Sequence, residues 1–92
     1  MKTAHVKGKK VKKVLLYALS TCIWCKKTRE LLDELGVDYD YVYVDLAEES
    51  DEKKDKEISK WNPELSFPIV VIDDKECIIG YKPEKIREKI GL

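Results

Sequence analysis

The sequence lacks most of the features that mark specialised classes of protein. Three cysteines in 92 residues are too few and too unevenly spaced for the structural disulfide framework of small secreted domains. The 18 basic and 18 acidic side chains cancel, so the net charge indicates neither nucleic acid nor a membrane as a partner. There is no internal repeat, linker or low-complexity segment. These absences, with a hydrophobic content of 43%, predict one domain with a modest core.

Charged residues are abundant and unevenly distributed. They make up 39% of the chain, against an average of about 25%. The start of the chain is basic and residues 45–57 are acidic. We expect residues 1–12 to form a basic N-terminal extension, either a tail or a short hairpin, and residues 13–92 to form the domain. The lysines at the start are interpreted as a solvated surface, with contact to an acidic partner as the alternative; they are Lys2, Lys7, Lys9, Lys10, Lys12 and Lys13.

Two of the cysteines, Cys22 and Cys25, are separated by two residues, between an apolar run over residues 14–19 and a helix-like segment. In a cytosolic protein, this spacing at a strand-to-helix junction indicates a dithiol/disulfide redox site. The start of a helix has unpaired N–H groups and a positive dipole, which favour thiolate over thiol at Cys22. Thiolate is the form that attacks a disulfide. Cys25 lies one turn further on, within reach to close a disulfide.

The first turn after these cysteines is basic. It contains Lys26, Lys27 and Arg29, although the helix dipole favours acidic residues there. Helix stability alone therefore does not account for them. We interpret Lys26 and Lys27, together with Arg29, as stabilising the nearby thiolate, with an ordinary solvated face as the alternative.

The apolar pattern predicts alternating strands and helices. After the strand at 14–19, apolar residues recur at helical spacing as far as Gly36, and residues 37–45 alternate as a second strand. An exposed helix over about 48–57, strands at 69–72 and 76–79 in a hairpin, and a last helix from Pro83 complete the chain. The order β-α-β-α-β-β-α predicts an α/β fold, in which three helices cover both faces of a four-stranded mixed sheet.

The start of the chain also imitates a secretion signal. A basic segment precedes the apolar run at 14–19, and Leu19-Ser20-Thr21-Cys22 imitates a lipoprotein cleavage site. Cleavage there would remove the first core strand and leave the cysteine pair at a bare terminus. We therefore expect a cytoplasmic protein.

Three short motifs occur at characteristic places in the predicted fold. They are Cys22-x-x-Cys25 after a buried strand, Ser66-Phe67-Pro68 before the third strand, and Gly80-Tyr81-Lys82-Pro83-Glu84 after the fourth. Together they resemble the glutaredoxin family. The resemblance covers residues 13–92 and implies a thioredoxin-like (glutaredoxin) fold and thiol–disulfide oxidoreductase activity.

The resemblance also implies roles for residues in these motifs. Cys22 would attack a target disulfide and Cys25 would resolve the mixed disulfide. The Phe67–Pro68 peptide would be cis, leaving the Phe67 backbone free to pair with a substrate as an added strand. The substrate-binding residues expected on this basis are Trp24, Phe67, Pro68, Gly80 and Tyr81.

The sequence departs from glutathione-dependent members at several positions. Ile23 and Trp24 stand where those usually have proline and tyrosine, and Leu19 stands where they have a lysine. The segment 80–84 is more similar to the glutaredoxin-like redoxins that supply electrons to ribonucleotide reductase. The resemblance thus implies a monomer that acts on protein disulfides, is reduced by a reductase, and has no cofactor beyond its redox-active disulfide. Glutathione is the alternative reductant.

A metal or iron–sulfur carrier is the alternative from another functional class. Cys22, Cys25, Cys77 and His5 are the ligand types of a Cys₃His zinc site. The second half of such a site lacks the usual ligand spacing, so we expect no metal. A cluster shared between two subunits, as some glutaredoxins hold, is the other possibility. We interpret Cys77 as a small buried hydrophobic residue on the fourth strand.

Overall fold

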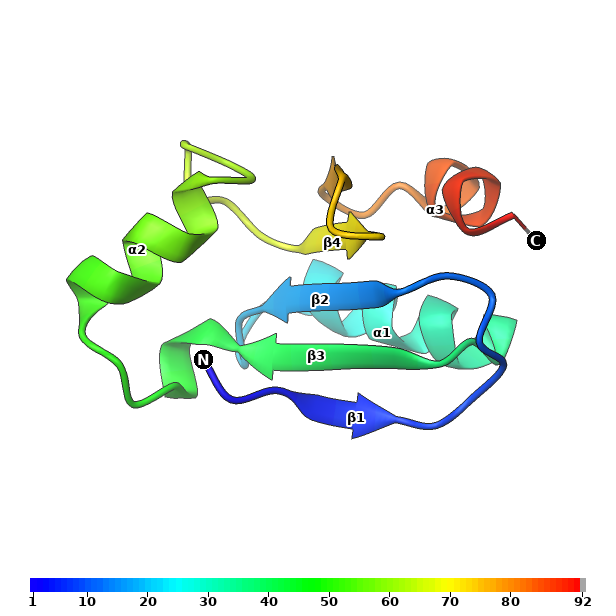
Figure 1. The fold of residues 1–92 in the computed structure, drawn as a ribbon, viewed down its shortest axis with the longest axis horizontal. Helices are drawn as coiled ribbons and strands as arrows, with labels where there is room; N and C mark the ends of the chain where they lie inside the picture. Colours follow the sequence, from blue (N-terminus) through cyan, green and yellow to red (C-terminus); the bar gives the residue numbers. More distant parts are fainter. Residues whose placement is uncertain (92) are drawn as a thin grey trace.

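A mixed sheet of five strands, in the order β1-β3-β2-β4-β5, runs through the structure, a computed structural model that describes residues 1–91. The β2–β3 pair is parallel and the other pairs are antiparallel. The strands are β1 (Ala4–Val6), β2 (Val14–Ala18), β3 (Tyr39–Tyr43), β4 (Ile69–Ile72) and β5 (Glu76–Ile79). The helices are α1 (Ile23–Leu35), α2 (Asp51–Ser59) and α3 (Pro83–Ile90), with a 3₁₀ turn, η1 (Val44–Leu46), after β3. This arrangement is the predicted thioredoxin-like fold with one additional strand (Figure 1).

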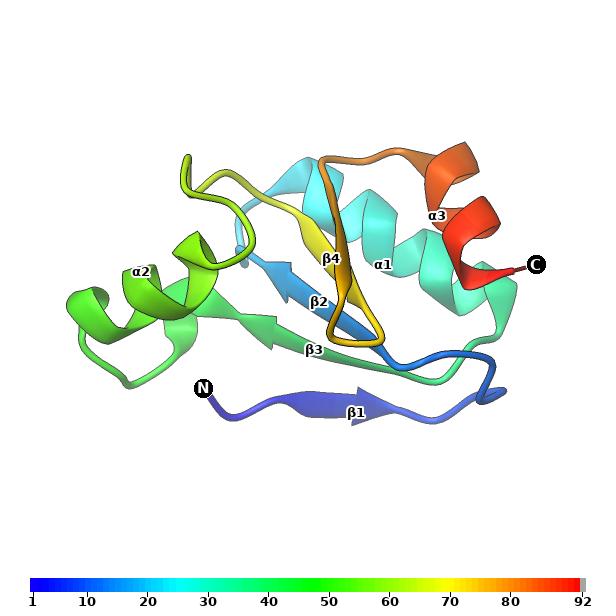
Figure 2. The same ribbon diagram turned by 45° about the horizontal axis from the view of Figure 1, so that its top comes forward.

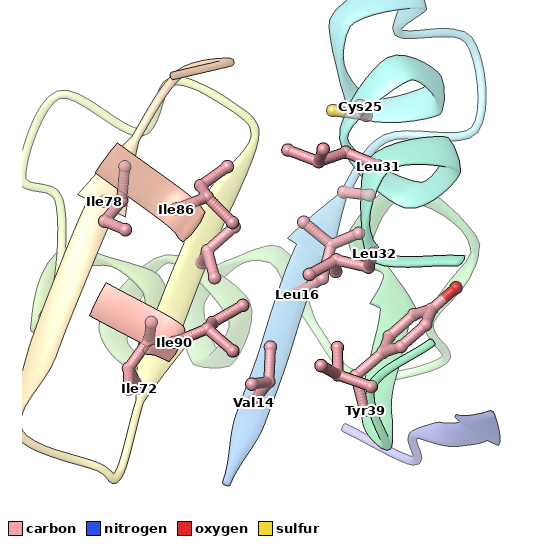
Figure 3. Packing of buried hydrophobic residues seen from close by; sticks show 13 residues of the cluster. Val14, Leu16, Cys25, Leu31, Leu32, Tyr39, Ile72, Ile78, Ile86 and Ile90 are labelled. Carbon is pink, nitrogen blue, oxygen red and sulfur yellow. The ribbon is translucent and has the colours of Figure 1, made fainter. Parts of the chain in front are cut away.

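The helices cover both faces of the sheet. On one face, α1 and α3 pack against alternate side chains of β2 and β4, and Figure 3 shows Leu32, Ile86 and Ile90 directed at this layer. On the other face, Ile58 of α2 packs against a smaller cluster that includes Tyr17. Every residue of β4 is buried, as expected for a continuous apolar run in a central strand.

Helix α1 ends at Gly36 as predicted and begins at Ile23, so Arg29 lies in its second turn rather than its first. Cys22 is its N-cap, and Gly36 ends it with φ 67° in the left-handed region that favours glycine. Thr28, Leu31 and Leu32 are buried at helical spacing on the face toward the sheet. The helix therefore leads from the end of β2 with the cysteines at its first turn.

The fifth strand lies within the segment expected to be a tail or a hairpin. Residues 4–6 pair antiparallel with β3, with His5 opposite Asp40, so the sheet has five strands rather than four. Figure 2 shows β1 as the edge strand beside β3, with a loop leading from it into β2. A strand of three residues with only Val6 partly buried has no alternating apolar pattern, which is why periodicity did not predict it.

Other boundaries differ by a few residues. Strand β3 ends at Tyr43, because residues 44–46 form the turn η1 rather than the predicted end of the strand. Helix α2 begins at Asp51, where the Ser50 side chain accepts a hydrogen bond from the Lys53 backbone N–H. Helix α3 begins at Pro83 as predicted. Within residues 1–91, no helix is both long enough and apolar enough to cross a membrane.

Candidate active site

The two cysteines lie at the start of α1 in different environments. Cys22 has an extended backbone, and its Sγ accepts a hydrogen bond from the backbone N–H of Cys25 at 3.2 Å. Cys22 is half-buried, whereas Cys25 is 1% exposed. Both are free thiols. A substrate sulfur can therefore reach Cys22 directly, while Cys25 lies beneath it.

The buried position of Cys25 changes its acidity. Desolvation raises the pKa of Cys25 to about 12, and its hydrogen-bonded neighbour Cys22 adds to the rise. Cys25 is consequently a neutral thiol at physiological pH. Cys22 is therefore the residue suited to attack a disulfide, because it can be reached and because the raised pKa of Cys25 keeps that buried thiol protonated.

The loop before the cysteines is held by a carboxylate from a distant part of the chain. Asp45, in η1, accepts the backbone N–H of Ser20 at Oδ1 (2.9 Å) and the Ser20 hydroxyl at Oδ2 (2.5 Å). The hydroxyl hydrogen bond is the main reason that the pKa of Asp45 is lowered. Sequence reasoning missed this pair, because the two residues are 25 positions apart. The only available signal was a serine just before a cysteine motif and an acid just after a strand.

The Phe67–Pro68 peptide is cis, as the resemblance implies. Pro68 is buried and Phe67 is half-buried. The Gly80 N–H donates to the Pro68 carbonyl at 2.8 Å, so the turn before α3 is tied to the start of β4. Cys22, Phe67 and Tyr81 are all half-buried against the same core cluster. The structure thus brings together residues from all three sequence motifs.

Apolar side chains are exposed beside Cys22. Ile23 and Trp24 are 63% and 54% exposed. The Trp24 ring stacks on Tyr81, with centroids 5.8 Å apart and planes inclined by 23°. This stack joins the start of α1 to the turn before α3. Large exposed apolar side chains next to a reactive group are typical of a surface that contacts another molecule.

A groove of about 330 Å³ opens on the other flank of α1. Lys26 lines it together with Cys22, whereas Lys27 is not among its lining residues in the described chain. Arg29 also lines it, but its guanidinium is held by tyrosines of β3: it donates to the Tyr43 hydroxyl at 3.1 Å and lies 4.0 Å over the Tyr41 ring. Arg29 therefore fastens α1 to the sheet, and Lys26 is the second basic residue in the groove that Cys22 lines.

Comparison with known proteins agrees with this site. The Glutaredoxin family model matches residues 14–78, which include the cysteine pair and Pro68. The chain belongs to the glutaredoxin family. The glutaredoxin of Methanosarcina mazei Go1 is 47% identical with a TM-score of 0.89, over 100% of this chain and 90% of that one. Methanosarcina acetivorans methanoredoxin is 48% identical with a TM-score of 0.84, over 92% and 90% of the two chains. A glutaredoxin-like 8.6 kDa protein of Clostridium pasteurianum is 30% identical over 84% of this chain and 96% of its own length.

The four residues considered as zinc ligands do not meet in this glutaredoxin. His5 is exposed on β1, where its ring contacts Asp40 and Asp38. Cys77 is half-buried on β5, packs against the cluster on the α2 face, and donates to the Trp61 carbonyl at 3.4 Å. Among residues 1–91, no three His, Cys, Asp or Glu side chains are arranged to hold a metal ion. Cys77 is thus on the expected strand, but it is less buried than expected.

Proposed function

We propose that this glutaredoxin is a dithiol reductase of protein disulfides. The observation that carries the proposal is the pair of exposed apolar side chains, Ile23 and Trp24, beside a reachable Cys22, with the Trp24 ring stacked on the half-buried Tyr81. A protein substrate can cover such a surface with its own apolar side chains, and covering it removes apolar area from water. Glutathione, a small polar tripeptide, has less apolar surface to bury there and therefore gains less binding free energy.

The proposed reaction has two exchange steps. The Cys22 thiolate attacks one sulfur of the target disulfide, forming a Cys22–target disulfide and releasing the other target sulfur as a thiolate that takes up a proton. Cys25 then loses its proton and attacks Cys22 Sγ, which closes the Cys22–Cys25 disulfide and releases the second target thiol. The target gains two electrons and two protons, which the two cysteines lose. The hydrogen bond that joins Cys25 N–H to Cys22 Sγ supports this order of attack.

Binding of the substrate backbone would use the segment before Pro68. In the proposed complex, an extended segment of the target pairs with Phe67 as an added strand. This mode needs no charged group on the substrate. Glutathione, by contrast, carries two carboxylates and an amine, and Leu19 supplies no charge at the position where the family usually has a lysine. Each missing charged hydrogen bond could cost about 1.5–3 kcal/mol.

The proposal extends to the electron donor and the setting. The segment 80–84 resembles that of redoxins reduced by a reductase enzyme, so we assign this donor in preference to glutathione. The protein would act as a monomer in the cytoplasm, where a dithiol is kept reduced.

The test compares two substrates with one chemical dithiol as the reductant. We expect saturable reduction of insulin disulfides and slow reduction of a glutathionylated small thiol. Trp24→Ala should raise KM for insulin about two- to tenfold. The reason is that a contact between the Trp24 ring and an aromatic side chain of the substrate is worth about 0.5–1.5 kcal/mol beyond its buried area. Trp24→Phe, which keeps an aromatic ring, is the matched control and should stay near the wild-type KM. Faster, saturable turnover of the glutathione substrate at micromolar concentration would contradict the proposal.

A further inference from the structure

Asp45 reaches the cysteine loop from outside the redox motif. It lies in η1, after β3, and both of its carboxylate oxygens accept hydrogen bonds from Ser20. Ser20 is two positions before Cys22 and is itself exposed. A carboxylate that binds both the backbone and the side chain of one residue fixes that residue in orientation as well as in position.

This restraint continues into the cysteine pair through backbone hydrogen bonds. The N–H of Cys22 donates to the Leu19 carbonyl at 3.2 Å, which closes the turn around Ser20. The Cys22 carbonyl accepts from the Lys26 N–H at 3.1 Å. A loop fixed at Ser20 is therefore also fixed where Cys22 begins the helix.

The carboxylate also brings a negative charge to the site. Its hydrogen bonds with Ser20 keep the pKa of Asp45 low, so it is ionised at neutral pH. The groove beside it is lined by two further acids, Asp51 and Asp55, and by one cation, Lys54. Asp45 is one of the groups that raise the pKa of Cys25, after burial and Cys22. The charge therefore acts on Cys25 as well as on the loop.

We propose that Asp45 is a positioning residue that also makes the Cys22–Cys25 pair a stronger reductant. The inference rests on the proposed dithiol function. Reduction of the disulfide adds two electrons and two protons and gives two thiols, and Cys22 is the one that attacks a target as a thiolate. A nearby carboxylate disfavours that thiolate, and it does so only in the reduced state, because a disulfide carries no charge. Asp45 therefore shifts the equilibrium toward the disulfide, so that the dithiol gives up its electrons more readily.

The experiment measures the redox equilibrium of the full chain against a buffer of a chemical dithiol and its disulfide. Asp45→Asn removes the charge and keeps an oxygen for the Ser20 N–H. We expect its equilibrium constant to move about two- to fivefold toward the reduced protein, which is roughly 10–20 mV for two electrons. Ser20→Ala is the matched control, since it removes the hydroxyl but keeps the carboxylate and the backbone donor. It should stay close to the wild-type equilibrium.

The dependence on salt distinguishes an effect of the Asp45 charge from an effect of the loop geometry. Because Asp45 is exposed, the difference between Asp45→Asn and wild type should shrink as ionic strength rises. Asp45→Ser, a second neutral variant, must show the same direction of shift, and it serves if Asp45→Asn does not fold. A wild-type equilibrium in both neutral variants overturns the inference, as does an equal shift in Ser20→Ala or a shift that salt leaves unchanged. The redox buffer replaces the protein target, so a chain that equilibrates with the buffer but does not reduce insulin contradicts the proposed function and not the role of Asp45.

Discussion

At the scale of single residues, the two cysteines differ because they lie on either side of the start of α1. Cys22 is the last residue before α1 and remains half-buried at the surface, while Cys25 is inside the first turn and almost wholly buried. Burial keeps Cys25 neutral, since desolvation penalises its charged form. The start of α1 thus carries one thiol that a substrate can reach, Cys22, and one that is buried away from solvent, Cys25.

This asymmetry predicts which variant will trap a substrate. In Cys25→Ser, the mixed disulfide formed by Cys22 has no internal thiol to resolve it, so it should accumulate with a disulfide target. In Cys22→Ser, the remaining thiol is buried and should form little adduct. Non-reducing electrophoresis and intact-mass measurement would detect the adduct. Trapping by Cys22→Ser in place of Cys25→Ser would reverse the two roles.

The parts of the site that could be predicted from the sequence are those with short-range signals. The spacing of Cys22 and Cys25 predicted their place at the start of a helix, and the family resemblance identified the cis peptide before Pro68. The contact between Asp45 and Ser20 could not be predicted, because it depends on where the end of β3 meets the loop after β2. The stack of Trp24 on Tyr81 depends in the same way on how α3 is placed beside α1.

At the scale of elements, β1 is held to the sheet by polar contacts as well as by its backbone. The His5 ring lies 2.6 Å from Asp40 Oδ1 and 3.1 Å from Asp38 Oδ1. Asp38 also accepts the backbone N–H of Gly8 at 3.0 Å. A Cβ at Gly8 would lie 2.5 Å from the backbone carbon of Val37, so this close approach requires glycine. The basic segment is therefore bound to the edge of the sheet by specific contacts, although its composition resembles that of a solvated tail.

These contacts predict a pH-dependent contribution of β1 to stability. The hydrogen bond with Asp40 is the main reason that the pKa of His5 is raised. A group whose pKa is raised by folding stabilises the fold fully below its unfolded value, about 6.5 for histidine, and loses that effect as the pH rises through the folded value. Urea unfolding should therefore show wild type more stable than His5→Asn at acidic pH, with the difference shrinking at alkaline pH.

The control for this prediction removes the two carboxylates that bind His5 instead of the His5 ring itself. In a background with both Asp38→Asn and Asp40→Asn, replacing His5 should produce no pH-dependent difference. The effect should be small, because the ring is about half exposed and solvent screens such pairs. A difference between wild type and His5→Asn that is constant across the pH range would show that the ring acts by packing alone.

At the scale of the whole molecule, one core joins the helices that carry the site. Leu31 and Leu32 of α1 and Ile86 and Ile90 of α3 belong to one cluster with the inner side chains of β2 and β4 (Figure 3). Helix α2 is attached separately, through Ile58, on the opposite face. The cysteine motif and the turn of Gly80 and Tyr81 are therefore placed relative to each other by the packing of α1 and α3 on the same face of the sheet.

A substitution in this shared cluster should consequently destabilise the whole domain. Ile86 is fully buried, and replacing a buried isoleucine by alanine costs about 2–5 kcal/mol of unfolding free energy. For a domain of this size, each kcal/mol lowers Tm by roughly 4–8 °C, so Ile86→Ala should lower Tm by at least about 8 °C. Because α1 and α3 share one cluster, circular dichroism and the fluorescence of Trp24, measured in a Trp61→Phe background because Trp61 also fluoresces, should report the same transition. Glu88→Ala, at an exposed position of the same helix, is the matched control and should change stability by no more than about 0.5 kcal/mol. A fluorescence transition at a lower temperature than the loss of secondary structure would mean that the site unfolds independently of the core.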